Sequence, residues 1–246
     1  MTPNVVIVMP AYNAEKTLRQ TLSAIPPQSY SQIVLVDDCS IDGTVHLAQE
    51  LGLKVIQHDK NKGYGGNQKT CYNTALELGA DIVVMLHPDY QYDPRLVPFL
   101  TGLIQLDVCD IMFANRIRTR REALQGGMPF YKYISNRFLT IIENIAFGQN
   151  LGEYHTGYRA FSKKSLQKLR YEDCSDDFVF DQQIVAQAAA CNLHIGDIPV
   201  SAKYFAEASS INFWRSSKYG LQTLWIVLCY LLHKSHIFRQ KFFTPL

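Results

Sequence analysis

Residues 82–94 constrain the fold of this chain more than any other stretch of its sequence. The first five are apolar and mostly branched, and the run ends abruptly at His87, Asp89 and Gln91. Strands that are covered on both faces are continuous apolar runs, so the pattern predicts a buried strand that ends at a site. Asp89 and Gln91 lie two residues apart, and their oxygen atoms can converge on one hard cation, Mg²⁺ or Mn²⁺. A strand followed by an acidic turn without a ligand is the structural alternative.

The first half of the chain repeats this order of a strand and then a helix. Segments with helical spacing separate the apolar runs, including a helix predicted over 67–78 and another from about Pro94. Strands alternating with helices predict an α/β domain with a mostly parallel central sheet and helices on both faces. The other strands are expected at 5–9, 33–36, 54–57 and 110–113.

Polar side chains follow three of these strands at the point where each ends. Ligands of parallel α/β sheets gather beyond the carboxyl ends of the strands, so the three groups together predict a nucleotide site. The groups are Tyr12 with Asn13, Asp37 with Asp38, and Asp89 with Gln91.

Two common nucleotide-binding classes lack their fingerprints in this sequence. There is no GxxxxGK[ST] phosphate loop, and no GxGxxG turn follows the first strand, which disfavours P-loop NTPases and dinucleotide oxidoreductases. Gly63, Gly65 and Gly66 form a predicted loop before a helix, but their spacing fits neither fingerprint. Close approach to a ligand and ordinary loop flexibility both remain open for these glycines.

Composition limits the compartment and the partners. The 246 residues are 47% hydrophobic and 19% charged, which suits one domain with a sizeable core and an appendage. A formal net charge of +2 gives no argument for a nucleic-acid partner. The six cysteines form no CxxC pair, so we expect core residues in a reducing compartment. We find no secretory signal and no run of about 18 apolar residues, and therefore expect a cytosolic protein.

Three motifs resemble those of family 2 glycosyltransferases, in particular dolichyl-phosphate mannose synthases and related polyprenyl-phosphate sugar transferases. They are residues 10–13 (Pro-Ala-Tyr-Asn), 36–44 and 87–94, and the likeness extends over about residues 4–200. The resemblance implies a Rossmann-like GT-A fold, a nucleotide-diphosphate sugar (a GDP- or UDP-hexose), a divalent metal and inversion of the anomeric centre.

The resemblance also implies roles for individual residues. Asp89 and Gln91 match the metal ligands, and Arg116 matches a basic residue that faces the phosphates. Lys132 and Ser135 lie where polyprenyl-phosphate transferases carry further basic and hydroxyl groups. The expected nucleotide-sugar-binding residues are Pro10, Tyr12, Val36, Asp38, His87, Pro88, Arg116 and Lys132, with the base and ribose on the first four.

Two departures from the family pattern affect the expected chemistry. His87-Pro88-Asp89 stands where the family often has Asp-Ala-Asp. A neutral imidazole supplies no negative charge, so the site is expected to bind metal more weakly or to bind a different metal. The Gln-x-x-Arg-Trp motif of processive relatives is absent from the sequence, which argues against polymer synthesis.

Residues 117–127 and 153–161 are expected near the site. The first segment has three basic side chains and two adjacent glycines, which suggests a lid, with a solvated loop as the alternative. The second resembles the family's Asp-x-x-x-Gly-Phe-Arg segment beside the sugar and acceptor, with Glu153 in place of the Asp. For Arg159 the alternative is a structural role at the edge of a strand, and His155 is expected at the surface.

Asp181 distinguishes two classes of acceptor. In transferases that act on hydroxyl groups, a carboxylate in this region often serves as general base. A phosphate acceptor is already ionised near neutral pH and needs no base. The leading expectation is transfer of a hexose to a polyprenyl (dolichyl or undecaprenyl) phosphate, with Asp89, Arg116 and Asp181 as the catalytic candidates. A hydroxyl acceptor and a non-catalytic nucleotide-sugar-binding protein remain the alternatives.

The C-terminal segment, residues 201–246, is expected to follow a transferase domain of residues 1–200. Apolar residues, two tryptophans and flanking basic residues are typical of an amphipathic helix on an anionic membrane, at the cytosolic face. Closure of the domain core and a contact between subunits are the alternatives.

Overall fold

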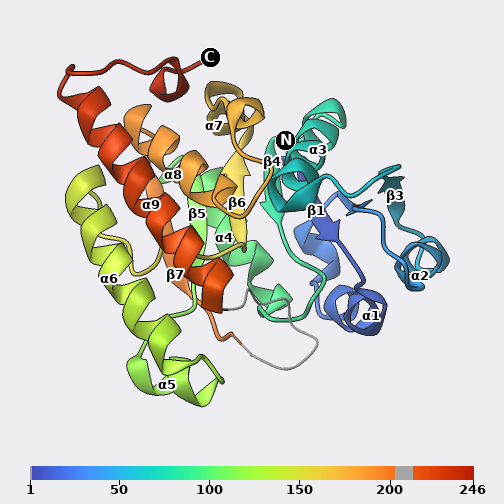
Figure 1. Cartoon of the computed structure of the whole chain (residues 1–246). Helices are drawn as coiled ribbons and strands as arrows, with labels where there is room; N and C mark the ends of the chain where they lie inside the picture. Colours follow the sequence, from blue (N-terminus) through green and yellow to red (C-terminus); the bar gives the residue numbers. More distant parts are fainter. Residues whose placement is uncertain (1, 203–212) are drawn as a thin grey trace.

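A seven-stranded sheet organises the computed structural model, which describes residues 2–202 and 213–246 (Figure 1). Its strand order is β3-β2-β1-β4-β6-β5-β7, and only β6 runs antiparallel to its neighbours. This confirms the predicted mostly parallel sheet of a GT-A fold. The strands are β1 (Val5–Ala11), β2 (Gln32–Asp37), β3 (Lys54–Gln57), β4 (Ile82–Met85), β5 (Ile111–Asn115), β6 (Arg159–Ser162) and β7 (Ile195–Pro199).

The central strands are buried on both faces, as their continuous apolar runs predict. Along β1, Val6 and Val8 belong to one core cluster, whereas Ile7 and Met9 belong to the cluster on the opposite face. The helices in the described part of the chain are α1 (Glu15–Ser23), α2 (Thr44–Glu50), α3 (Gly63–Glu77), α4 (Val97–Gln105), α5 (Arg120–Gln125), α6 (Phe130–Phe147), α7 (Lys163–Lys168), α8 (Phe180–Ala190) and α9 (Phe213–Lys234).

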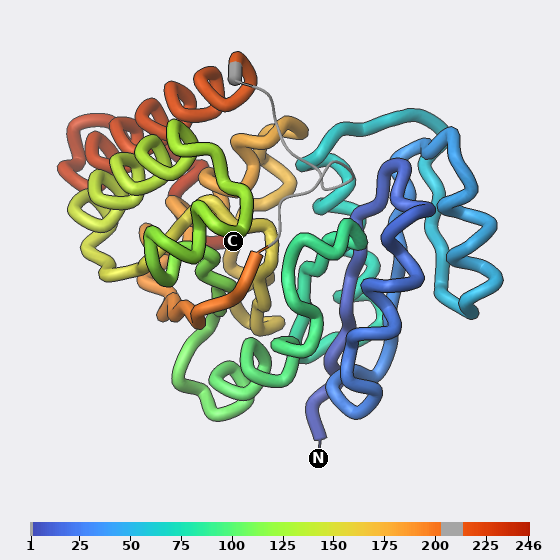
Figure 2. Tube along the Cα trace, turned by 90° about the horizontal axis from the view of Figure 1, so that it is seen from below, coloured from blue at the N-terminus to red at the C-terminus, as the bar shows by residue number. Residues whose placement is uncertain are grey.

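Different helices lie at the two ends of the sheet. Figures 1 and 2 both place β1, β2 and β3 with α1 and α2 at one end, and α6 and α9 at the other. Helix α9 packs against α6 and α8, so much of the C-terminal segment adjoins the sheet domain. Residues 203–212, part of that segment, lie outside the described residues. Among the described helices, none has the length and apolar character needed to cross a bilayer.

Two local predictions were wrong. Helix α3 begins at Gly63 rather than at about 67, so the glycines form its first turn instead of a loop. Close packing explains why glycine is needed in this turn, because a Cβ on Gly65 would collide with the carbonyl oxygen of Ser175 and with Phe180. The segment 117–127 is also not a continuous loop, since α5 forms within it and Thr119 caps that helix by accepting from the Glu122 N–H.

Candidate active site

One pocket of about 780 Å³ brings together most of the predicted site residues. It is lined from the end of β4, the end of β5, the first half of α6, the loop before β6, the start of α8 and the start of α9. The predicted residues in its lining are His87, Asp89, Gln91, Arg116, Lys132, Ser135 and Asp181. None of residues 117–127 lines it, and the lid role of that segment stays a prediction.

The residues expected to hold the base and ribose lie outside this lining. Pro10 and Val36 are buried within β1 and β2. Pro88 is also buried, and its carbonyl accepts a hydrogen bond from Thr17 Oγ1 at 2.6 Å. Tyr12 is 56% exposed at the end of β1, where an aromatic ring can serve as a platform for a base.

Asp38 is buried at the end of β2 and organises the start of α3. Its carboxylate accepts from the backbone N–H of Lys62 (2.7 Å) and of Gly63 (3.0 Å). Nδ1 of His58 lies 2.8 Å from the same carboxylate. Asp38 therefore positions the glycine-containing turn, and its contact with a base stays a prediction.

Asp89 and Gln91 form a compact turn beside the pocket. The N–H of Gln91 donates to Oδ1 of Asp89 at 3.1 Å, and Tyr90 between them has a left-handed φ of 53°. No group of three or more His, Cys, Asp or Glu side chains among the described residues is arranged to hold a metal. One carboxylate and one amide oxygen still fit Mg²⁺ or Mn²⁺, because these ions usually take further ligands from substrate phosphates and water.

His87 packs between an aromatic ring and a glycine. Its ring stacks on Tyr64 with centroids 5.6 Å apart, and a Cβ on Gly157 would lie 2.6 Å from its Nε2. Burial lowers the pKa of His87, an effect that Asp89 and Asp181 oppose. The imidazole is therefore neutral near pH 7 and adds no positive charge beside Asp89.

Asp181 is fixed in the pocket by residues that are distant in sequence. Its carboxylate accepts from Tyr64 Oη at 2.8 Å and from Gln68 Nε2 at 3.2 Å, and Nη1 of Arg159 lies 3.5 Å away. Burial and the nearby Asp181 raise the pKa of Tyr64, so its hydroxyl is the donor. Tyr64 was missed as a site residue, although an aromatic ring among three glycines was a usable signal.

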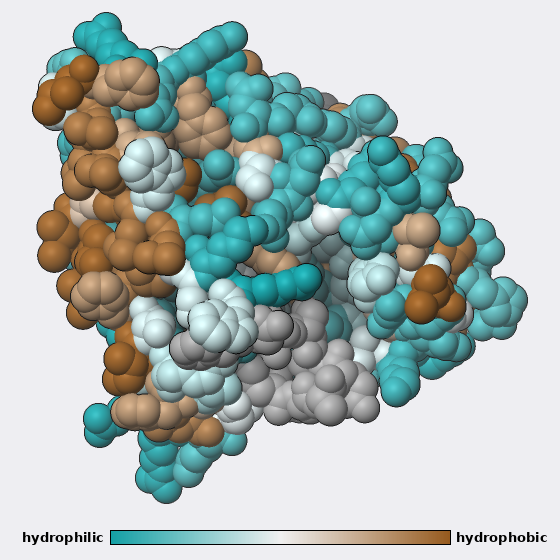
Figure 3. All heavy atoms as spheres, in the orientation of Figure 1, coloured by the Kyte–Doolittle hydropathy of each residue, from teal (hydrophilic) through white to brown (hydrophobic). Residues whose placement is uncertain are grey.

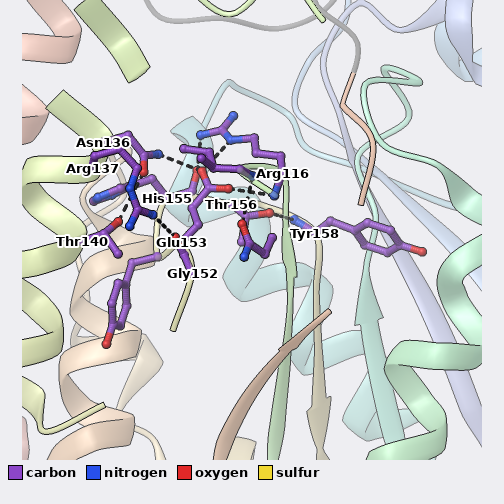
Figure 4. A network of polar contacts seen from close by, with 12 residues as sticks. Arg116, Asn136, Arg137, Thr140, Gly152, Glu153, His155, Thr156 and Tyr158 are labelled. Carbon is purple, nitrogen blue, oxygen red and sulfur yellow. Dashed lines mark hydrogen bonds and ion pairs between the residues drawn. The ribbon is translucent and has the colours of Figure 1, made fainter. Parts of the chain in front are cut away.

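Arg116 is held by a buried carboxylate, as Figure 4 shows. Glu153 is 0% exposed, and it accepts from Arg116 Nε at 2.6 Å, from the Arg116 N–H at 3.0 Å and from Asn136 Nδ2 at 2.8 Å. Arg116 Nη2 also donates to the carbonyl of His155 at 2.5 Å. Burial, with a contribution from Arg116, lowers the pKa of Lys132, which lines the same pocket. Two cations in a partly desolvated pocket favour an anionic ligand.

The segment 153–161 requires one correction. His155 was expected at the surface, but its side chain is 7% exposed and lines the pocket, because α6, α8 and α9 close around it. Arg159 is buried behind the pocket, where it donates to the backbone carbonyls of Tyr154, Thr156 and Asp181. These contacts to backbone carbonyls are those of a structural arginine, the alternative role stated for Arg159.

Comparison with known proteins identifies the class of this fold and site. The sequence model of glycosyl transferase family 2 matches residues 6–170, and the chain belongs to this family of glycosyltransferases. It is 31% identical to the UDP-N-acetylglucosamine–dolichyl-phosphate N-acetylglucosaminyltransferase of Methanococcus voltae, over 80% of this chain and 85% of that protein. It is 29% identical to a low-salt glycan biosynthesis hexosyltransferase of Haloferax volcanii, over 82% of this chain and 48% of the relative.

Solved structures share the fold at lower sequence identity. Glucosyl-3-phosphoglycerate synthase from Mycobacterium tuberculosis, in complex with Mn²⁺, UDP-glucose and glycerol 3-phosphate, superposes with a TM-score of 0.71 at 15% identity. A complex of the same synthase with Mg²⁺ and UDP has a TM-score of 0.71 at 16% identity. Each match covers 94% of this chain and 80% of the synthase.

Proposed function

We propose that this family 2 glycosyltransferase transfers a hexose from a nucleotide-diphosphate sugar to a polyprenyl phosphate, with inversion of the anomeric carbon. The observation that carries the proposal is a single pocket with two kinds of wall. One wall holds the polar residues Asp89, Gln91 and Arg116. The wall formed by α6, α9 and the residue Met128 before α6 adds apolar side chains, which are Met128, Phe138, Leu139, Leu221 and Leu224. A diphosphate suits the first wall, and the isoprenoid end of a lipid phosphate suits the second.

The donor is proposed to be a UDP- or GDP-hexose. The UDP-containing complexes of the structural neighbours and the name of the Methanococcus relative, a UDP-N-acetylglucosamine transferase, support testing UDP-sugars first. Asp89 and Gln91 would hold Mg²⁺ or Mn²⁺ on the diphosphate, where a divalent cation stabilises the charge of the departing group. Tyr12 and Asp38 are the proposed contacts to the base and ribose, with Pro10 and Val36 beneath them.

The proposed transfer is a single displacement. An oxygen of the acceptor phosphate attacks the anomeric carbon, the bond from that carbon to the diphosphate breaks, and the negative charge moves to the nucleoside diphosphate. Arg116, oriented by Glu153, stabilises this charge from a preorganised position. Lys132 lies close enough to Arg116 for the pKa of Lys132 to be lowered by that charge, and it is proposed to contact a phosphate in the same pocket.

An apolar surface adjoins the pocket and supports a membrane-bound acceptor. Exposed side chains recur along α6 and α9, and Figure 3 shows hydrophobic residues gathered over these two helices. Tyr131, Phe138 and Leu221 belong both to this surface and to the pocket lining. The surface, which we call the α6–α9 face, consists of Phe130, Tyr131, Ile134, Phe138, Ile141, Ile145, Trp214, Leu221, Trp225, Leu228 and Leu231.

We propose that the α6–α9 face rests on the cytosolic surface of a membrane. Contiguous exposed apolar surface of this kind marks an interaction site. Basic side chains near it on α9 and the following segment favour anionic headgroups: these are Lys218, Lys234, Arg239 and Lys241. A lipid phosphate in that membrane could then reach the pocket without leaving the bilayer surface.

A hydroxyl acceptor is the second candidate, and one observation favours it. Asp181 lies in the pocket with its carboxylate oriented by Tyr64 and Gln68, as a general base for a hydroxyl would be. Glycans, lipids and proteins would all offer such a group.

Release of nucleoside diphosphate separates these candidates. The protein is incubated with UDP- and GDP-hexoses, with and without Mn²⁺, and with polyprenyl phosphate, polyprenol or simple sugars. The proposal predicts Mn²⁺-dependent release only with polyprenyl phosphate. Release with hydroxyl acceptors alone, or donor binding without turnover for every acceptor, would refute it.

A further inference from the structure

A buried polar cluster joins α9 to the rest of the domain, and no proposed step of the reaction uses it. It consists of His155, Glu143 on α6, Gln182 on α8 and Tyr219 on α9, and we call it the His155 cluster. Glu143 and Gln182 are each 1% exposed. Three helices and the loop before β6 therefore contribute one polar side chain each to this cluster.

The contacts within the His155 cluster define its geometry. Gln182 Nε2 donates to Tyr219 Oη at 2.6 Å and lies 2.8 Å from Nδ1 of His155. Tyr219 Oη is 3.0 Å from the same Nδ1. Nε2 of His155 lies 3.2 Å from Oε2 of Glu143, without the alignment of a hydrogen bond.

The His155 cluster touches both walls of the pocket. Tyr219 and His155 are themselves lining residues, and α9 lines the pocket from Arg215 to Leu224. The backbone carbonyl of His155 accepts from Arg116, while Gln182 directly follows Asp181 in the chain. One residue thus contacts α9 through its ring and Arg116 through its carbonyl.

We propose that His155 is a positioning residue that fixes α9, and hence the acceptor wall, relative to Arg116. Apolar contacts between helices tolerate sliding and rotation, whereas buried polar groups are costly unless they meet their partners. A shift of α9 would break the contacts that the Tyr219 hydroxyl makes with the His155 ring and the Gln182 amide. The inference rests on the proposed lipid-phosphate function, because it assigns the α9 wall to the acceptor.

Tyr219→Phe tests this inference by removing one hydroxyl from the His155 cluster. We expect the KM for polyprenyl phosphate to rise about 5- to 10-fold, as for one lost buried hydrogen bond, with the KM for the donor unchanged. Tyr230→Phe is the matched control, because Tyr230 is buried on the same helix against Phe147 and Phe243, outside the pocket lining. The control should leave both KM values unchanged.

A conservative replacement separates positioning from general support of the fold. His155→Ala should raise the acceptor KM, and His155→Asn should restore it in part, since the Asn oxygen can replace Nδ1 as an acceptor. An equal fall in thermal stability in both variants, without a change in the acceptor KM, would mean that His155 only supports the fold.

Hydrogen exchange of the α9 amides from 215 to 224 gives a readout that needs no substrate. Tyr219→Phe should speed their exchange, and Tyr230→Phe should not. Wild-type exchange and wild-type acceptor KM in Tyr219→Phe would overturn the inference. If the wild-type protein glycosylates no lipid phosphate, the proposed function fails, and the exchange experiment still decides whether the His155 cluster holds α9.

Discussion

Glu153→Gln is the substitution that most sharply tests how Arg116 is positioned. The carboxylate is fully buried and accepts three hydrogen bonds, two of them from Arg116. A glutamine retains one acceptor oxygen, and its amide NH₂ must then face a donor of Arg116 or Asn136. The variant therefore loses a charge-assisted hydrogen bond and gains a contact between two donors.

The expected loss of stability is about 2–3 kcal/mol. A hydrogen bond to a charged group contributes about 1.5–3 kcal/mol, and removing one partner of a fully buried ion pair costs about 3–5 kcal/mol. The lower part of this range applies because the Arg116 side chain is 16% exposed and keeps its contact with the carbonyl of His155. At about 2–4 °C per kcal/mol for a chain of this size, the Tm should fall by about 4–12 °C.

The fall in kcat should be larger than the loss of folded protein alone would cause. A misplacement of about 1 Å in a catalytic group can lower the rate by about 10²-fold, and we expect a fall in kcat of that order for Glu153→Gln. Differential scanning fluorimetry gives the Tm, and release of nucleoside diphosphate below the Tm gives kcat. Glu122→Gln is the control, since it breaks a carboxylate–arginine pair of similar length on the exposed side of α5. A variant with a lowered Tm but kcat within about threefold of the wild type would refute the role of Glu153 in orienting Arg116.

Three further predictions follow from the pocket and its surroundings. Asp89→Ala should abolish turnover with little change in Tm. EDTA should abolish the turnover of the wild-type protein until Mn²⁺ is restored. Near-normal activity in the variant would exclude Asp89 as a metal ligand. Asp181→Asn should keep at least about a tenth of the wild-type rate with polyprenyl phosphate, whereas loss of a general base would lower the rate by about 10²-fold or more. Trp225→Glu should weaken co-sedimentation with phosphatidylglycerol-containing vesicles. Leu106→Glu, at an exposed apolar residue outside the α6–α9 face, should not. Equal binding by both variants would argue against membrane contact through the α6–α9 face.

Strands β1 to β5 could be predicted from the sequence, whereas β6 and β7 were missed, and the central strands are the clearest because they are apolar along their whole length. Both faces of β1 and β4 contact the core, so every side chain in these strands is apolar. The turn that holds Asp89 and Gln91 follows from the same logic, since it begins where the apolar run ends. That Arg116, Lys132 and Asp181 would join them came from resemblance to a family, and the pocket brings all five residues together.

The features that were missed depend on contacts between distant segments. Tyr64 donates to Asp181 across 117 residues, and His155 is buried only because helices from three other parts of the chain meet over it. Helix α3 begins among glycines, which have weak helix propensity, because backbone at 175–176 packs closely against them. Local periodicity carries no signal for such tertiary contacts.

The central claim is that the acceptor is a lipid phosphate, and one matched comparison tests it most directly. Wild-type protein, Mn²⁺ and a UDP- or GDP-hexose are combined with polyprenyl phosphate or with polyprenol of the same chain length, and the glycolipid product is measured by mass spectrometry. We expect a hexosyl-phosphoryl lipid from the phosphate and no product from the alcohol. Glycosylation of the alcohol, with the phosphate unreacted, would contradict it.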